Sequence, residues 1–121
     1  MAWEIEFTDV FEAWWNDLSE PEQEEINAKV ELLEERGPTL PRPHADRIES
    51  SRHSNMKELR GKVNDRHLRI LFAFDPRRTA VLLLGGDKTD DPAWYDKFVP
   101  IADDLFDRHL KAVKQERKKK E

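Results

Sequence analysis

The chain has 121 residues, of which 37% are hydrophobic and 39% charged, values that fit one water-soluble domain with a single core. We therefore expect one domain over residues 1–121, with residues 116–121 as a frayed basic tail. The absence of cysteine excludes disulfides, thiolate catalysis and cysteine-bound zinc. No stretch approaches the roughly 20 apolar residues that span a bilayer, and residues 1–6 lack signal-peptide features. We expect a cytoplasmic protein with no membrane partner.

The net charge of −5 is unevenly distributed along the chain. Residues 1–50 hold 14 acidic and 4 basic side chains, whereas residues 51–90 hold 5 acidic and 9 basic ones. The first segment repels phosphate and the second can attract it. A nucleic acid, if bound, is therefore expected at the middle of the chain.

The first 37 residues predict a strand and two helices. Residues 3–7 alternate apolar and polar side chains, which indicates a half-buried strand. Thr8 or Asp9 can cap the next helix. A second helix is expected to begin at Ser19, because a capping serine is followed by a first-turn proline and by Glu22 three residues on. Gly37, followed by a proline, is expected to end this helix.

The rest of the chain predicts a small sheet and a last helix. Residues 38–55 contain three prolines and are expected to be irregular. Residues 56–62, 68–74 and 79–84 predict three strands of an antiparallel meander, and a helical pattern runs from Pro92 to about Gln115. The order β-α-α-β-β-β-α predicts an α+β fold, in which a helical hairpin packs on one face of the sheet and leaves the other partly open.

Arg69 is the most informative charged residue, since it lies inside the most apolar predicted strand. It should point away from the face of Ile70 and thus stand on the open side of the sheet. Lys57 and Arg60, on the neighbouring strand, can add charge near it. Such fixed cations suit phosphodiester cleavage without a metal, because they can stabilise the charge that develops on a phosphorane. The alternative is that Arg69 is only a solubilising edge charge.

Other side chains give weaker indications. Further basic residues that could contact a substrate are Lys62, Arg66, Arg77 and Arg78. Lys57 could act as an acid or base if Arg60 and Arg69 depress its pKa. The histidines show no metal-ligand spacing, so we expect no metal site and no cofactor.

Trp14 and Trp15 are adjacent on the first predicted helix and diverge by about 100°. They cannot both face the same core, so one is expected to be partly exposed, where it could anchor a partner. The alternative buries one under the sheet and the other under the last helix.

Four segments in the right order resemble a known family; they are residues 51–60 (SRHSNMKELR), 68–78 (LRILFAFDPRR), 83–89 (LLGGDKT), and the helical stretch from Trp94-Tyr95 to His109-Leu110. They resemble RelE/HigB-type toxins of type II toxin–antitoxin systems, in the phage Gp49-like branch of the RelE/ParE superfamily. The resemblance implies a RelE-like fold and a ribosome-dependent endoribonuclease that cuts mRNA in the ribosomal A site. It also implies neutralisation by a small DNA-binding antitoxin.

The resemblance also implies roles for individual residues. Arg69 matches the strand arginine that stabilises the transition state. Lys57 and Arg60 match basic residues that hold phosphate or assist proton transfer. Lys88 stands where a basic residue often follows the last core strand, and Tyr95 matches an aromatic residue that stacks on or orients the substrate nucleotide.

Two other functions are compatible with the sequence. One is a ParE-like toxin, which shares the fold and acts on DNA gyrase without cutting RNA. The other is a decayed toxin that keeps only its binding to the antitoxin.

Overall fold

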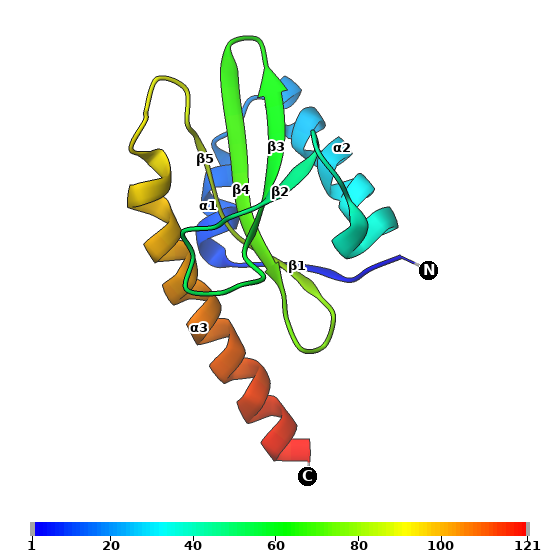
Figure 1. Ribbon diagram of the computed structural model, residues 1–121. Coiled ribbons are helices and arrows are strands. Elements are labelled where there is room, and N and C mark those ends of the chain that lie inside the picture. The colour runs from blue at the N-terminus through cyan, green and yellow to red at the C-terminus, as the bar shows by residue number, and fades with distance from the viewer. Residues whose placement is uncertain (1, 121) are drawn as a thin grey trace.

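A computed structural model describes residues 2–120 of the chain, and the side chains of residues 2–118 (Figure 1). The elements follow the predicted order, with one short strand and one turn added between the hairpin and the meander. They are β1 (Ile5–Phe7), α1 (Asp9–Asn16), α2 (Glu20–Arg36), the 3-10 turn η1 (Gly37–Thr39), β2 (Ala45–Arg47), β3 (Lys57–Val63), β4 (Arg66–Phe74), β5 (Ala80–Asp87) and α3 (Trp94–Lys120).

The expected helix signals all act locally. Thr8, rather than Asp9, caps α1, and its hydroxyl accepts a hydrogen bond from the Phe11 amide at 3.1 Å. Ser19 and Glu22 form the reciprocal capping box that begins α2. Gly37, with φ of 58°, ends it in a left-handed conformation that favours glycine.

The sheet has five strands in the order β1-β5-β4-β3-β2. The predicted meander of β3, β4 and β5 is confirmed, β2 adds antiparallel to β3, and β1 pairs parallel with β5. The expectation of an irregular segment over residues 38–55 is therefore wrong for β2. Prolines before this strand exclude a helix, but a three-residue edge strand needs to pair on one side only.

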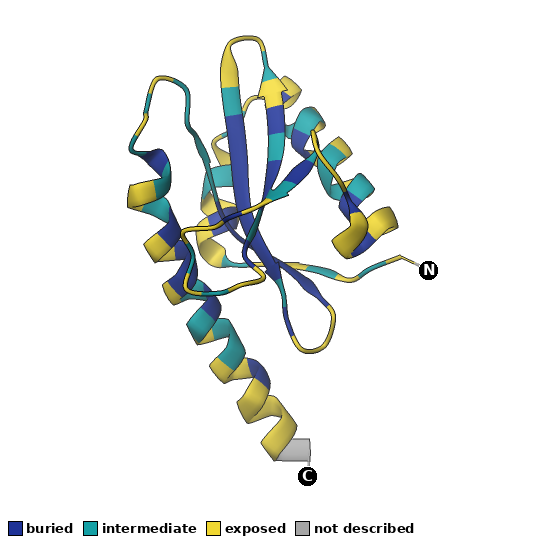
Figure 2. Cartoon of the chain, viewed as in Figure 1, coloured by how far each residue is buried: buried dark blue, intermediate teal, exposed yellow. Residues whose placement is uncertain are grey.

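Both faces of the sheet carry helices, and the second face stays partly open, as expected (Figure 1). The hairpin α1–α2 covers one face, where Leu59, Ile70 and Phe72 lie in the core. On the other face, α3 covers the half nearer the β4–β5 turn and packs Trp94 and Phe106 on the sheet. Figure 2 shows β4 and β5 buried over most of their length, whereas the β3–β4 turn is exposed. On the second face, only the half near the β3–β4 turn is left without a helix.

Helix α3 extends to Lys120, beyond the expected end near Gln115. Its last turns project past the body of the molecule (Figure 1). Fraying of residues 116–121 in solution stays a prediction, and Glu121 lies outside the described residues. Within residues 2–120, no helix combines the length and the apolar character needed to cross a membrane.

Candidate nucleic-acid interface

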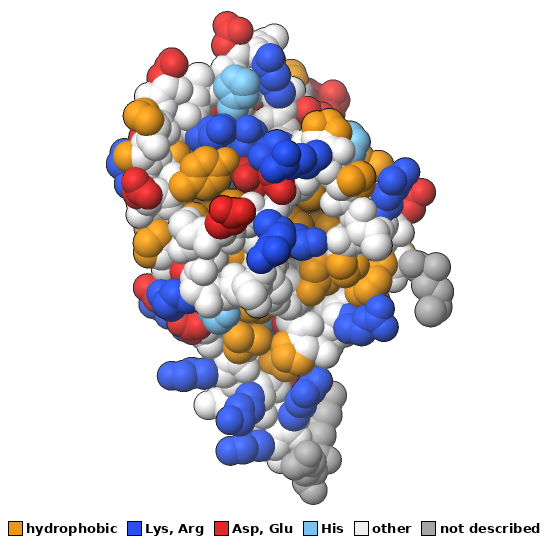
Figure 3. Space-filling view, viewed as in Figure 1, with side chains coloured by type: hydrophobic (Ala, Val, Ile, Leu, Met, Phe, Trp, Pro, Cys, Tyr) orange, Lys and Arg blue, Asp and Glu red, His pale blue; other side chains and the backbone are white. Residues whose placement is uncertain are grey.

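Basic side chains from three strands meet on the half of the sheet that α3 leaves uncovered. Arg60 and Arg69 are directly opposite each other on β3 and β4, and Lys62 is opposite His67 one step nearer the turn. Next to them, directly after the end of β5, the Lys88 amide donates to the His67 carbonyl at 3.0 Å. We call these five residues the cationic face, and Figure 3 shows blue side chains gathered in this region.

Arg69 lies on the predicted side of the sheet but is not an open surface charge. It is only 8% exposed, and its Nε lies 3.0 Å from Oε1 of Glu58, which is 4% exposed. This contact is an ion pair without hydrogen-bond alignment, while Arg69 Nη1 donates to the Leu68 carbonyl at 2.9 Å. Arg69 is therefore buried and paired, and its interpretation as a solubilising edge charge is wrong. A buried charge needs such a partner.

Glu58 joins several groups of the site. Its Oε1 accepts a hydrogen bond from the Tyr95 hydroxyl at 2.7 Å, and its Oε2 lies 3.6 Å from Arg60 Nη2. Burial first, and then the bond to Glu58, raise the pKa of Tyr95. The phenol therefore stays protonated at neutral pH and remains a donor. Arg60 is also held by Asp46, at 3.1 Å.

Tyr95 connects the cationic face to two shallow surface pockets. One is lined by Lys88 and residues 90–92, the other by Glu58, Asp46 and residues of the β2 region. The Lys88 ammonium lies 5.5 Å from the centroid of the Tyr95 ring, and the Trp94 ring meets it edge-on at 5.2 Å. These contacts favour an orienting role for Tyr95 over a platform for base stacking.

Lys57 does not belong to this cluster, contrary to expectation. It shares the hairpin face with Leu59, because successive strand residues point to opposite sides. Its ammonium donates to the Pro38 carbonyl at 2.9 Å. Burial, and then the charge of Arg47, lower the pKa of Lys57. The direction of the shift is the one expected, but Arg60 and Arg69 are not its cause.

The remaining candidate cations divide between the two ends of the sheet. Lys62 is exposed on the cationic face. Arg66 lies at its border but is paired with Asp87 at 2.9 Å and with Glu22. Arg77 and Arg78 lie in the β4–β5 turn, at the opposite end, so the structure does not bring them to the cationic face.

The opposite end holds its own buried charge cluster. The Asp75 carboxylate, fully buried, accepts hydrogen bonds from Arg77 Nη2 at 2.7 Å and from His109 Nε2 at 2.8 Å. Asp75, His109 and Glu6 are also the one trio in the described part of the chain that is close enough to share a metal ion. The guanidinium of Arg77, which also reaches Glu6 at 2.8 Å, already supplies the positive charge there.

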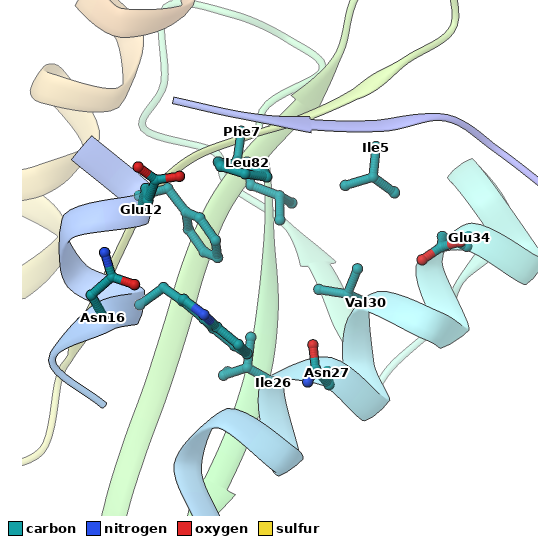
Figure 4. Close-up of a pocket in the computed structure, with 11 residues that line it drawn as sticks. Ile5, Phe7, Glu12, Asn16, Ile26, Asn27, Val30, Glu34 and Leu82 are labelled. Atoms are coloured by element: carbon teal, nitrogen blue, oxygen red, sulfur yellow. The ribbon is translucent and has the colours of Figure 1, made fainter. Parts of the chain in front are cut away.

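Trp14 and Trp15 are both half-buried, so partial exposure holds for each. Trp14 packs so closely on β5 that a Cβ at Gly85 would lie 2.2 Å from its ring. Trp15 lines a pocket of about 420 Å³ between α1, α2 and the β1 edge. Figure 4 shows its apolar wall, with Glu12 and Glu34 at opposite ends.

The sequence analysis missed three residues of the site, which are Glu58, Asp46 and His67. The alternation of Glu58, Arg60 and Lys62 along one strand is the signal that places them on one face and Lys57 on the other. Nothing comparable marks His67, whose position beside Lys62 follows from the β3–β4 register.

Comparisons with known proteins give a consistent relationship. The family described as "Phage derived protein Gp49-like" matches residues 13–107. Two proteins of Mycobacterium tuberculosis are similar over 100 residues each. "Putative toxin HigB2" is 46% identical over 81% of this chain, and "Putative toxin HigB3" is 47% identical over 82%. The match spans 50% of the length of the first relative and 86% of the second.

Solved structures agree at the level of the fold. A chain of the archaeal RelE–RelB complex from Pyrococcus horikoshii covers 74% of this chain with a TM-score of 0.55 at 9% identity, and 99% of that chain is matched. Free Escherichia coli toxin RelE, as a double arginine-to-alanine mutant, covers 78% with a TM-score of 0.55 at 13% identity, and 92% of it is matched. With a RelE-like fold and these relatives, the chain belongs to the Gp49-like family of HigB-type toxins.

Proposed function

We propose that this toxin is a metal-independent endoribonuclease that cleaves mRNA on the ribosome, and that the cationic face is its active site. One observation carries the proposal. On a protein with a net charge of −5, five basic or protonatable side chains converge on the half of the sheet that no helix covers. A concentration of fixed positive charge is what a phosphodiester substrate needs for binding and for stabilisation of the transition state.

The charges of the cationic face are only partly neutralised. Glu58 balances Arg69, and Asp46 binds Arg60 and also Arg42. For Lys62 and Lys88, no carboxylate lies within ion-pair distance among residues 2–118. The surplus of positive charge is therefore at the exposed margin, where an RNA strand can reach it.

In the expected reaction, the phosphate ester bond to the 5′-oxygen of one nucleotide is replaced by an ester bond to the 2′-oxygen of the preceding nucleotide in the same RNA. The ribose 2′-oxygen attacks the adjacent phosphorus, its proton passes to a base, and the 5′-oxygen leaves with a proton from an acid. The products are a 2′,3′-cyclic phosphate and a 5′-hydroxyl. In this scheme the guanidiniums of Arg60 and Arg69 face the non-bridging oxygens.

His67 is the group best suited to move a proton. An imidazole ring has one nitrogen that can accept a proton and another that can donate one, and His67 lies between Lys62 on β3 and Lys88 beside it. Its ring has no hydrogen-bond partner among the described residues, unlike the rings of His44, His53 and His109. Tyr95 and Glu58 are positioning residues in this account, because they contact each other and Arg69.

Dependence on the ribosome follows from the total charge. The acidic hairpin repels RNA, and the cationic face alone offers few phosphate contacts, so free RNA should bind weakly at physiological salt. The ribosome would supply the missing binding energy and would present the mRNA.

An antitoxin is proposed to bind at two places. An acidic segment complements the cationic face, and an apolar segment fits the pocket beside Trp15. RelE has been crystallised with RelB in two complexes, from Pyrococcus horikoshii and Escherichia coli, which supports a bound antitoxin for this chain as well.

The decisive test removes charge from the site without leaving a buried ion unpaired. Glu58→Gln/Arg69→Gln keeps the net charge and should abolish cleavage of mRNA on translating ribosomes. Asp75→Asn/Arg77→Gln makes the same change at the other end of the sheet and should cleave normally. If the wild type cuts no RNA but inhibits DNA gyrase, the ParE-like alternative is correct; if it only binds the antitoxin, it is a decayed toxin.

A further inference from the structure

The projecting end of α3 carries basic side chains that neither the core nor the cationic face uses. Every residue from 114 to 118 is exposed, as are Arg108 and Lys111. The last buried side chain of the helix is Val113. Figure 3 shows blue side chains around this projection, below the body of the protein.

These cations form a stripe with helical spacing. At 100° per residue, Arg108, Lys111, Lys114 and Lys118 fall within an arc of about 120° on one side of α3. The residues that pack on the sheet, Phe106 and Val113 among them, lie on the opposite side. The stripe therefore points away from the body of the toxin.

The stripe is not neutralised by acidic groups. No carboxylate lies within ion-pair distance of these four side chains among residues 2–118. The acids on the same side of the helix are already engaged, because Asp104 pairs with Arg52 at 3.1 Å and Asp107 binds His53 at 2.7 Å. Glu116 lies outside the arc of the stripe. A chain with surplus negative charge thus exposes a row of four positive charges that have no ion-pair partner among residues 2–118.

The distance from the cationic face is large. With a rise of 1.5 Å per residue, the stripe lies about 20–35 Å along the axis from Tyr95. It is too far away to touch the scissile phosphate. Its length of roughly 15 Å and its spacing suit the phosphates of a folded RNA, which present negative charge at regular intervals.

We propose that the α3 stripe, defined as Arg108, Lys111, Lys114 and Lys118, binds the phosphate backbone of ribosomal RNA. The inference rests on the ribosome dependence proposed above. The stripe anchors the toxin while the cationic face takes the mRNA, and so provides binding energy that the acidic body lacks.

The test measures binding to vacant ribosomes, so that no cleavage is involved. The Lys111→Gln/Lys114→Gln variant keeps a helix former at each position, and circular dichroism checks the fold. We expect affinity to fall about tenfold at physiological salt, with a salt dependence weaker by about 1.5 in log K against log salt. The matched control, Lys29→Gln/Arg36→Gln on the acidic hairpin, removes the same charge and should bind as the wild type does.

Three results would overturn the proposal. They are equal binding by the stripe variant and the control, no binding of the wild type to ribosomes, and loss of antitoxin binding by the stripe variant while ribosome binding is kept. A wild type that binds ribosomes through the stripe but leaves mRNA uncut would support the stripe and refute the nuclease.

Discussion

Two buried carboxylates organise separate parts of the same sheet, Asp75 at the β4–β5 turn and Glu58 on β3 opposite Leu71, and their surroundings differ in the balance of charge. Asp75 is fully enclosed and accepts a hydrogen bond from His109, and the guanidinium beside it, Arg77, is paired with both Asp75 and Glu6. Glu58 is almost as deeply buried, but Arg69 and Arg60 beside it are followed by Lys62 and Lys88, which have no described acidic partner. The first cluster is complete, whereas the second has a surplus.

The difference indicates which cluster is structural and which is functional. A buried ion pair is by itself weak evidence of either stability or function. The Asp75 cluster connects β1, the β4–β5 turn and α3, which explains it as a tie between elements. The Glu58 cluster holds Arg69 in one orientation at the edge of a charged surface, which suits a transition-state donor.

The largest expected effect separates the histidines of the two regions. His67→Gln should lower the rate of mRNA cleavage by about 10²–10³-fold, because it removes a proton-transfer group. In His109→Gln, the glutamine amide can still donate a hydrogen bond to Asp75, so this variant should cleave mRNA at the wild-type rate. Rates on programmed ribosomes between pH 6 and 8 check this. Equal loss in both variants would mean that the two clusters are not functionally distinct.

Stability should separate the two regions less sharply than cleavage does. Arg69→Ala and Arg77→Ala each remove a guanidinium that is paired with a buried carboxylate. Arg69→Ala leaves the buried Glu58 with the Tyr95 hydroxyl and the more distant Arg60 as its remaining partners, and should cost about 3–5 kcal/mol in the free energy of unfolding. Arg77→Ala should cost less, since His109 and the Thr79 amide still bind Asp75. Urea unfolding measures both, and Glu58→Gln should restore much of the stability lost in Arg69→Ala.

The pocket of the hairpin should be independent of both clusters. Trp15→Ala should weaken the antitoxin complex by about 2 kcal/mol, as for a central aromatic anchor, and leave mRNA cleavage unchanged. Titration against the protein encoded beside this gene measures the affinity. Trp14→Ala is the control at an adjacent position, because Trp14 packs on Gly85 instead of lining the pocket. Unchanged affinity in Trp15→Ala would limit neutralisation to the cationic face.

The smallest effect concerns Asp87 at the border of the cationic face. Burial raises its pKa, but hydrogen bonds from Thr89 and Arg66 outweigh this and lower it to about 2. A carboxyl with a depressed pKa stabilises the fold above its unfolded pKa, near 4, and loses this contribution as the pH falls towards 2. Asp87→Asn should therefore remove at most about 2 kcal/mol at pH 7 and nothing at pH 2. A constant difference across this range would assign the effect to packing.

The sequence was sufficient for most of the fold. The capping box at Ser19, the stop at Gly37 and the alternation in the strands depend on short-range chemistry, and all of them are confirmed. The edge strand β2 was missed, because three residues between prolines and polar side chains have no periodicity to detect.

The site was harder to predict because it depends on register and on long-range pairing. Arg69 was placed on the correct side of its strand, but its burial against Glu58 and Tyr95 involves contacts between β4, β3 and α3. The charge of Lys57 alone suggests a place in the cluster, but the alternation of side chains along β3 puts it on the hairpin face. Arg77 and Arg78 come shortly after β4 in the sequence, but they lie at the end of that strand that is farthest from the cationic face.

The most direct test of the central claim maps the 5′ ends of mRNA after the purified toxin is added to translating ribosomes. The account predicts new 5′-hydroxyl ends within coding sequences for the wild type and for Asp75→Asn/Arg77→Gln, and none for Glu58→Gln/Arg69→Gln. Cleavage by the Glu58→Gln/Arg69→Gln variant at the wild-type rate would contradict the assignment of the cationic face, and intact mRNA with the wild type would contradict the nuclease itself.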